Sequence, residues 1–382
     1  MVSLHSFHAV ADMQLLEIGI FRSTKLKSVK FIPSDNTYEI FDANDSLIYH
    51  LQKNESVIVK VNSNKTISVK VPGEDLGDFT EVRILSNNFE SYYNIKGISP
   101  VTKDRDYFGG VSVFSLNGNL DVVSLVSMHH YLIGVIESES GNHQGTEYYK
   151  VQAIISRTYA LKNSSKFRHE GFMMTDLVNC QVYLGKMYRN PKIEQAVKET
   201  SNMVLVDDEM DFISAAFYSN SGGQTANSED VWSREVPYLR SVSDPFSKGR
   251  STYYWTKTFD KEDFLKKLSS YYNYPIDDSM AVALALNWGQ VNRAKYFVDW
   301  KYHILLTDFR KDFKLRSTYF SVAMDDGKVL LKGRGFGHGV GLSQQGAMTM
   351  CDMGYSYKDV LHFYYTGVHL IDLNQREFYL AD

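Results

Sequence analysis

The sequence predicts an α+β fold in which a β-rich N-terminal region precedes a mixed α/β core. Residues 15–126 contain runs with strand periodicity and no helical pattern of any length. From about Tyr131 onward, apolar residues recur at helical spacing and alternate with further strand-like segments. The 382 residues, 43% of them hydrophobic, suffice for two domains or one elaborated domain. We expect domains at 1–126 and 127–382, the second with a variable insertion at 248–305.

Two hairpins are expected in the N-terminal region. Val57–Val61 and Ile67–Val71 are β-branched runs, and Asn62–Lys65 supplies turn residues between them. Asn117-Gly118 is a strong hairpin signal because both residues tolerate the positive φ angles that a tight turn needs.

The core alternates between helices and strands. Apolar residues from Glu147 to Leu161 recur at helical spacing, Thr146 is placed to cap this helix, and Arg157 lies off the centre of its apolar stripe. Pro191 opens a second helix, since proline is favoured in the first helical turn. Further helices are expected at 260–268, 342–353 and 358–365, and strands at 203–206, 212–218 and 317–331.

Charge and composition exclude several classes of protein. The net charge of −4 argues against a nucleic-acid partner, for which a basic excess would be expected. The most basic stretch, Arg310–Arg316, is interrupted by Asp312 and is expected to form a strand or turn with solvated charges. Cys180 and Cys351 give no disulfide framework, although one bridge between them stays open. Neither a membrane-spanning apolar run nor a signal peptide is recognised in the sequence.

The densest motif is the glycine-rich stretch 333–346, whose glycines suit a backbone that passes close to another group. It lacks the spacing of a phosphate-binding loop. His338 at its centre is a candidate ligand, base or hydrogen-bond donor; the alternative is a structural histidine that satisfies the loop backbone. A second motif, 216–225, contains Ser221, but its surroundings differ from a nucleophile elbow and are typical of a turn.

Two carboxylates end an apolar run, Glu137 and Glu139. An apolar wall raises the pKa of a carboxyl by desolvation, which makes it a proton donor near neutral pH. Residues two apart on a helix point in different directions, so we expect one carboxylate to be exposed and the other to face a cleft. The alternative is two solvated surface acids. We expect no metal site, since no zinc-binding spacing of His and Cys is present.

Five motifs in order resemble the stage II sporulation protein D (SpoIID) family, which includes the amidase-enhancer proteins. The resemblance covers about 127–372, with a weaker stretch between Pro245 and Leu305. The motifs lie at 131–139, 150–161, 180–183, 218–239 and 335–347.

The resemblance implies a peptidoglycan lytic transglycosylase that cleaves glycan strands, in particular peptide-stripped ones. The family's catalytic acid falls on Glu139. The candidate substrate-binding residues in the matching motifs are Arg157, Tyr159, Ser219, Ser221, His338 and Gln344.

The sequence departs from the family pattern at two places. Many members carry a Cys-x-x-x-His-Cys zinc cluster where this chain has Thr175, Asn179 and Cys180, so we expect neither zinc nor another cofactor. Ser140-Gly141 replaces a frequent Met-Pro and predicts a looser turn after the acid.

The alternative function is a non-catalytic peptidoglycan-binding protein that stimulates an N-acetylmuramoyl-L-alanine amidase, as the amidase-enhancer relatives suggest. Either function places the protein in the cell envelope, outside the cytoplasmic membrane, with glycan strands as its partner. A third alternative, a serine hydrolase acting through Ser221, would be labelled by a serine-reactive probe.

Overall fold

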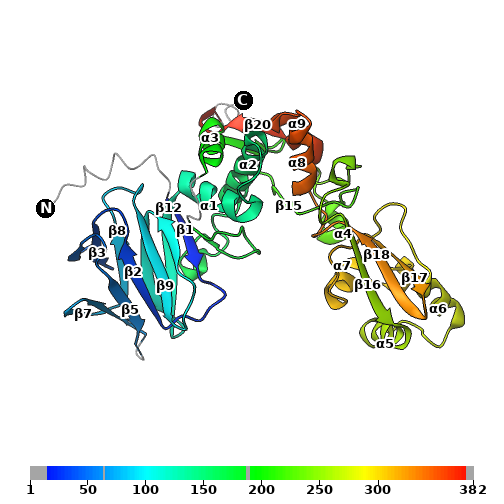
Figure 1. The fold of residues 1–382 in the computed structure, drawn as a ribbon, viewed down its shortest axis with the longest axis horizontal. Helices are drawn as coiled ribbons and strands as arrows, with labels where there is room; N and C mark the ends of the chain where they lie inside the picture. The colour runs from blue at the N-terminus through cyan, green and yellow to red at the C-terminus, as the bar shows by residue number, and fades with distance from the viewer. Residues whose placement is uncertain (1–14, 63–64, 186–189, 376–382) are drawn as a thin grey trace. The chain divides into compact units, whose positions relative to one another are not determined.

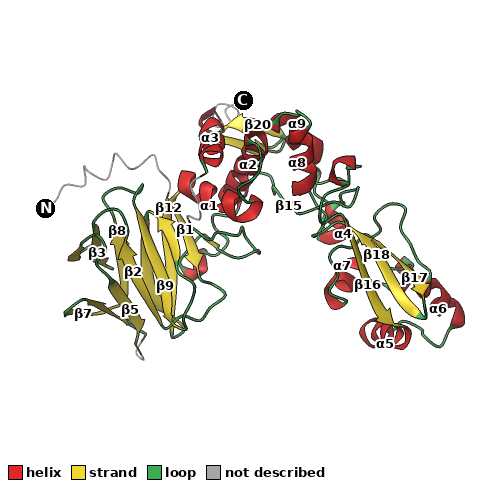
Figure 2. Cartoon of the chain, viewed as in Figure 1, coloured by secondary structure: helices red, strands yellow, loops and turns green. Residues whose placement is uncertain are grey.

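The computed structural model describes residues 15–62, 65–185 and 190–375. The chain divides into two compact units, Met1–Asn202 and Met203–Asp382. Helices and strands contribute to both units (Figure 2), which confirms the predicted α+β class. The expected change from strands to helices lies inside the first unit, where one strand ends at Ser127 and a helix begins at Met128.

The strands of the first unit form two sheets (Figure 1), one in the order β13-β1-β12-β11-β8-β3-β4 and the other in the order β10-β9-β2-β5-β6-β7. The pairings are antiparallel except that β1 and β13 run parallel. Their bounds are β1 Leu15–Ile20, β2 Ser28–Pro33, β3 Tyr38–Asp42, β4 Leu47–Leu51, β5 Val57–Val61, β6 Ile67–Val71, β7 Glu74–Phe79, β8 Glu81–Leu85, β9 Tyr92–Ser99, β10 Arg105–Phe108, β11 Gly110–Leu116, β12 Asn119–Ser127 and β13 Met174–Thr175.

Alternating side chains form the core between the two sheets. Along β5, Val57 and Val59 are fully buried while the residues between and after them are exposed. Tyr93 of β9 donates a hydrogen bond through Oη to the Gly110 carbonyl of β11 at 3.1 Å, which ties one sheet to the other. The strand period of the sequence therefore defines which face of each sheet is buried.

The strand pairing of both predicted hairpins is described, but the turn is fully described in only one of them. β11 and β12 pair antiparallel around Asn117 and Gly118, whose φ angles are 53° and 70°, as predicted. β5 and β6 pair as predicted, although the turn between them includes residues 63–64, which lie outside the described residues.

The helices of the first unit follow β12 and pack on one another, and they confirm two predicted helices. Their bounds are α1 Met128–Ser140, α2 Thr146–Lys162 and α3 Pro191–Glu199. The Ser127 hydroxyl caps α1 by accepting a hydrogen bond from the His130 N–H. The cap predicted for α2 is wrong: Thr146 is its first residue and Gly145 takes the cap position, without a side-chain hydrogen bond.

Within residues 203–375, the second unit contains three small sheets, formed by β14 and β20, by β15 and β19, and by β16, β18 and β17. Its strands are β14 Met203–Val206, β15 Phe217–Tyr218, β16 Tyr254–Asp260, β17 Phe320–Asp325, β18 Lys328–Arg334, β19 Leu342–Ser343 and β20 His369–Asp372. Its helices are α4 Ser228–Val231, α5 Lys261–Tyr272, α6 Ser279–Leu286, α7 Leu306–Asp312, α8 Gln344–Asp352 and α9 Tyr357–Tyr364.

The sheet of β16, β18 and β17 packs with α5, α6 and α7 around an aromatic-rich core that includes Trp255, Phe309 and Phe320. One prediction holds only in part here: residues 313–316 form a turn and Lys311, Lys314 and Arg316 are exposed, as expected, but the first residues of the stretch are helical. The stretch expected to be a strand or turn with solvated charges begins inside α7, and Arg310 is half-buried because its helix packs on this core through Phe309.

Candidate functional site

Glu139 lies in the last turn of α1, where the helix emerges from the packed centre of the first unit. The residues from His130 to Glu137 are buried, and Glu139 itself is half-buried. Its Oε1 accepts a hydrogen bond from the Val182 N–H at 2.8 Å. Glu139 makes no other hydrogen bond or ion pair with a described residue, so its second oxygen is available to a ligand.

The segment around Val182 is also held against α1 by two side chains that precede Glu139 on the helix. Ser138 Oγ accepts from the Leu184 N–H at 3.2 Å, and Tyr131 Oη donates to Gln181 Oε1 at 3.1 Å. Gly134 allows this close approach, because a Cβ there would lie 2.6 Å from the Tyr183 ring. The glycine of this motif thus serves helix packing and keeps Val182 within reach of Glu139.

The environment of Glu139 favours its protonated form. Burial raises the pKa of Glu139 above the ordinary glutamate value, and the Val182 N–H opposes this by lowering it. The direction agrees with what the apolar run of the sequence predicts. Glu139 can therefore hold a proton at a higher pH than a solvated glutamate.

The expectation that one of the two carboxylates is exposed is wrong. Glu137 is only 4% exposed, and is the more buried of the pair. The reason is that α1 packs against α2 and α3, so that more than one face of its last turns is covered.

Arg157 and Tyr159 lie on α2 in the same unit. Arg157 is 5% exposed, although its spacing places it off the centre of the apolar stripe. Burial lowers the pKa of Arg157 to about 10, so its guanidinium stays charged at neutral pH. Tyr159 Oη donates to the Asn179 carbonyl at 3.3 Å. Burial raises the pKa of the Tyr159 hydroxyl, and the neighbouring Cys180 raises it further.

At the position of the family's zinc cluster, the chain forms a hydrogen bond. Thr175 Oγ1 donates to Asn179 Oδ1 at 2.9 Å, and Cys180 lies beside Tyr159. Among the described residues there is no group of three or more His, Cys, Asp or Glu arranged to hold a metal ion. Within the same part of the chain, neither Cys180 nor Cys351 forms a disulfide.

The other candidate residues lie in the second unit. Ser219 is half-buried, and its Oγ lies 3.3 Å from Thr252 Oγ1. Gln344 begins α8 and is 8% exposed, and its Nε2 has no hydrogen-bond partner among the described residues.

Ser221 is fully buried and its hydroxyl is used within the fold. Its Oγ donates to Asp244 Oδ2 at 2.7 Å and accepts from the Gly223 N–H at 3.1 Å. Arg293 donates to its carbonyl at 2.7 Å. These contacts support the interpretation of the motif as a structural turn and not as a nucleophile.

Both ring nitrogens of His338 contact the backbone. Nδ1 accepts from the Val340 N–H at 3.1 Å, which leaves the proton on Nε2, 3.0 Å from the Phe217 carbonyl. Burial lowers the pKa of His338 to about 4, so the ring is neutral at neutral pH. Of the two interpretations left open by the sequence, this geometry supports the structural one.

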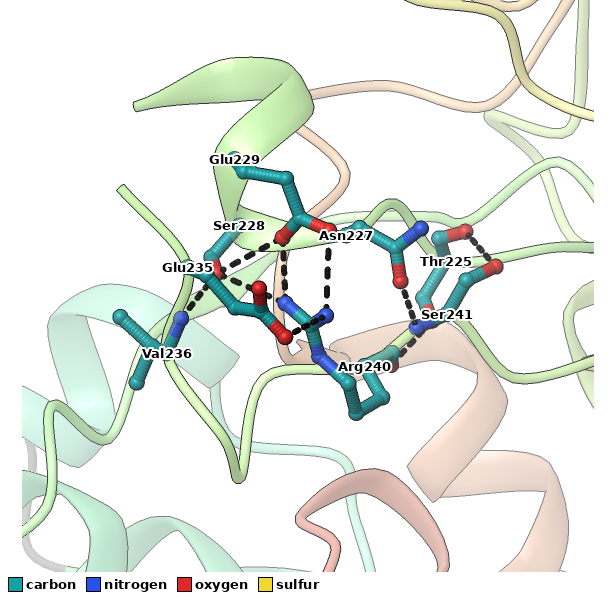
Figure 3. Close-up of polar contacts among 8 residues, drawn as sticks. All are labelled: Thr225, Asn227, Ser228, Glu229, Glu235, Val236, Arg240 and Ser241. Atoms are coloured by element: carbon teal, nitrogen blue, oxygen red, sulfur yellow. Dashed lines mark hydrogen bonds and ion pairs between the residues drawn. The ribbon is translucent and has the colours of Figure 1, made fainter. Parts of the chain in front are cut away.

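Two features beside the histidine were not among the candidate site residues, although Trp232 lies within the 218–239 motif and Arg310 and Arg316 bound the most basic stretch. Trp232, 43% exposed, lies with its ring 5.6 Å from that of His338. Trp232 follows α4, which Arg240 fixes through Glu229 and the Ser228 hydroxyl (Figure 3). The second feature is a group of arginines around the glycine-rich loop; three of them occur within 25 residues of the sequence, at 310, 316 and 334, which is the signal that could have identified them.

No helix among the described residues has both the length and the apolar character needed to cross a bilayer. A family model described as "Stage II sporulation protein" (SpoIID) matches residues 116–206. The stage II sporulation protein D of Bacillus amyloliquefaciens is 30% identical over 301 residues, which cover 75% of this chain and 84% of that protein.

Two proteins of Bacillus subtilis (strain 168) are also similar. Its stage II sporulation protein D is 30% identical over 263 residues, 65% of this chain and 75% of that protein. A protein named amidase enhancer is 29% identical over 292 residues, which cover 63% of this chain and 40% of that protein.

Proposed function

Because the chain belongs to the stage II sporulation protein D family, we propose that it is a peptidoglycan lytic transglycosylase that uses Glu139 for proton transfer. The family and the names of its relatives support a role at the cell wall, and the specific reaction is the proposal. The observation that carries it is a half-buried carboxyl with a raised pKa, one oxygen fixed by a backbone N–H and the other open to a ligand.

In this reaction one carboxyl acts twice. Protonated Glu139 donates its proton to the glycosidic oxygen as the bond from that oxygen to C1 of N-acetylmuramic acid breaks, so that the neighbouring sugar leaves as an alcohol. The 6-hydroxyl of the muramyl residue then bonds to C1 and gives its proton to the Glu139 carboxylate. The acid is regenerated, a 1,6-anhydro end forms and no water is consumed.

The local structure suits a group that must both give and take a proton. Partial burial keeps Glu139 protonated before the bond breaks, and the Val182 N–H stabilises the carboxylate afterwards. A two-carboxylate hydrolase instead needs a second acid to activate water or to form a covalent intermediate. Glu137 is not such a partner, because it is buried more deeply than Glu139.

A second candidate function is stimulation of a cell-wall amidase without cleavage. The relative named amidase enhancer favours it. So does the replacement of the family's zinc cluster by the hydrogen bond between Thr175 and Asn179. Both functions act on peptidoglycan glycan strands and require the protein to lie in the cell envelope, outside the cytoplasmic membrane.

Product analysis separates the two functions. Purified protein is incubated with peptide-stripped glycan strands in water enriched in ¹⁸O, and the strand ends are identified by mass spectrometry. We expect anhydro ends that carry no ¹⁸O. Ends that contain ¹⁸O would indicate a hydrolase. Intact stripped strands, together with stimulation of an added amidase in a parallel assay on peptide-bearing peptidoglycan, would indicate the enhancer function.

A further inference from the structure

Four arginines surround the glycine-rich loop of the second unit: Arg293, Arg310, Arg316 and Arg334. Arg334 lies in the loop itself, directly before Gly335. Arg316 is distant in sequence but contacts the loop, because the Gly337 N–H donates to its carbonyl at 3.0 Å. None of the four forms an ion pair with a carboxylate in the part of the chain that the structure describes.

Three of the four guanidinium groups lie over aromatic rings. Arg334 and Arg293 both lie over the ring of Tyr319, with their Cζ atoms 4.1 and 5.0 Å from its centroid. Arg316 lies over Phe336 at 5.8 Å, and Arg310 Nε donates to the Arg316 carbonyl at 3.2 Å. Arg293 and Arg334 thus share one aromatic ring and Arg310 contacts the backbone of Arg316, with no carboxylate among the described residues paired to any of the four.

Arg240 in the same unit shows the ordinary alternative (Figure 3). Its guanidinium forms ion pairs with Glu229 and Glu235, and these contacts raise its pKa. Burial lowers the pKa of Arg293, and neighbouring Arg334 and Arg310 lower it further, which shows how close the like charges lie. Unlike Arg240, the four arginines around the loop are therefore not held in place by ion pairs with any neighbouring carboxylate that the structure describes.

The four guanidinium groups differ in how many of their donors the fold uses. Within the described part of the chain, Arg310 donates through Nε alone. The Arg293 guanidinium donates hydrogen bonds to the carbonyls of Gln224 and Ser221 and to the Thr318 hydroxyl. The guanidinium groups of Arg316 and Arg334 donate no hydrogen bond to any described residue.

A further buried polar group without a partner among the described residues lies near Arg293. Tyr218 is 5% exposed, its hydroxyl has no hydrogen-bond partner among the described residues, and it lies near enough to Arg293 for the guanidinium to affect its pKa. The hydroxyl also lies near enough to the Asp244 carboxylate to be affected by it, so Tyr218 is not part of the site proposed below.

We propose that Arg316 and Arg334 form a binding site for a carboxylate carried on a glycan. Planar guanidinium groups match the geometry of carboxylates. The exposed rings of Phe336 and Trp232, 42% and 43% exposed, supply flat apolar faces of the kind on which sugar rings stack. The site therefore suits muramyl residues whose lactyl carboxylate is free, and it rests on the proposal that the protein binds glycan strands.

The test compares two strand preparations that differ only in charge. Peptide-stripped strands are used either with free lactyl carboxylates or with these groups converted to methyl amides. Binding to the full-length chain carrying Glu139→Gln is measured by fluorescence anisotropy, so that strands are not consumed. We expect about tenfold tighter binding of the carboxylate form, in line with charge-assisted hydrogen bonds.

The preference is expected to vanish when Arg316→Gln and Arg334→Gln are added. Lys328→Gln is the matched control: it removes one charge at the opposite end of β18, about 20 Å from Arg334, and should keep the preference. An unchanged thermal melt verifies that each variant is folded. Equal binding of both strand forms by the parent protein, or a preference that survives in the arginine variant, would overturn the proposal. Cleavage by the protein with Glu139 intact is scored separately, so failure of the proposed enzyme activity is distinguishable.

Discussion

The carboxylate site on α1 and the glycine-rich loop of the second unit are both rich in motif residues, yet their polar atoms are used differently. Glu139 has one oxygen fixed and one open. His338 and Ser221 have their side-chain polar atoms bonded within the fold. The comparison teaches that a dense cluster of Gly, Ser and His can reflect the demands of a tightly packed backbone, whereas chemistry needs a polar atom that is left open.

The largest expected effect is on cleavage by Glu139→Gln. Glutamine keeps the shape of the side chain but cannot transfer the proton, so the rate of anhydro-end formation should fall at least ~10²-fold while strand binding persists. Glu147→Gln, the same change at an acid paired with Lys150 on α2, should leave the rate unchanged. A Glu139→Gln protein that releases anhydro ends at the parent rate would reject the proposed role.

Replacing the loop histidine should act on stability first. His338→Ala leaves the Val340 N–H and the Phe217 carbonyl without partners and opens space between Tyr218 and Trp232. We expect a loss of about 2–4 kcal/mol in the free energy of unfolding. Urea denaturation measures this, and an unchanged midpoint would show that the ring is not structural.

The same histidine predicts a pH dependence of stability. The pKa of His338 is lowered to about 4 in the fold, while an unfolded histidine titrates near ~6.5. Between these values the unfolded chain binds the proton and the folded chain does not, so stability falls as pH decreases from about 6.5 to 4, by up to about 3 kcal/mol. Denaturation across this range should show a shallower decline for His338→Gln; parallel curves for the two proteins would contradict the assignment.

The smallest effect is expected from Ser221→Ala. Asp244 loses one donor but keeps Ser247 Oγ and two backbone N–H groups, and Gly223 loses its acceptor. The free energy of unfolding should fall by about 1–2 kcal/mol. If the variant instead melts like the parent protein but no longer binds glycan, Ser221 contacts substrate.

Local sequence signals predicted much of the fold. The Asn117-Gly118 hairpin, the alternation along β5 and the helix that begins at Pro191 follow from the φ preferences and the periodicity of a few neighbouring residues. The domain boundary at residue 126 and the site residues remain predictions.

Contacts between residues distant in the chain could not be predicted from the local sequence pattern. The Val182 N–H reaches Glu139 across 43 positions, and no local pattern predicts such a pairing. Glu137 was expected to be solvated or to diverge from Glu139, but its burial depends on how α2 and α3 pack on α1. Arg310–Arg316 was expected to be a strand or turn because basic residues, Asp312 and hydrophobic residues are mixed in it. Its first residues are helical instead, because the burial of Phe309 just before it holds α7 against the core.

The central claim is that one sheltered side chain keeps its proton longer than a glutamate in water does. Its most direct test is a titration by ¹³C NMR of protein labelled at the glutamate carboxyl carbons, with the Glu139 signal assigned as the one missing from the Glu139→Gln spectrum. The account predicts a midpoint above the ordinary glutamate value. A midpoint at or below that value would contradict it.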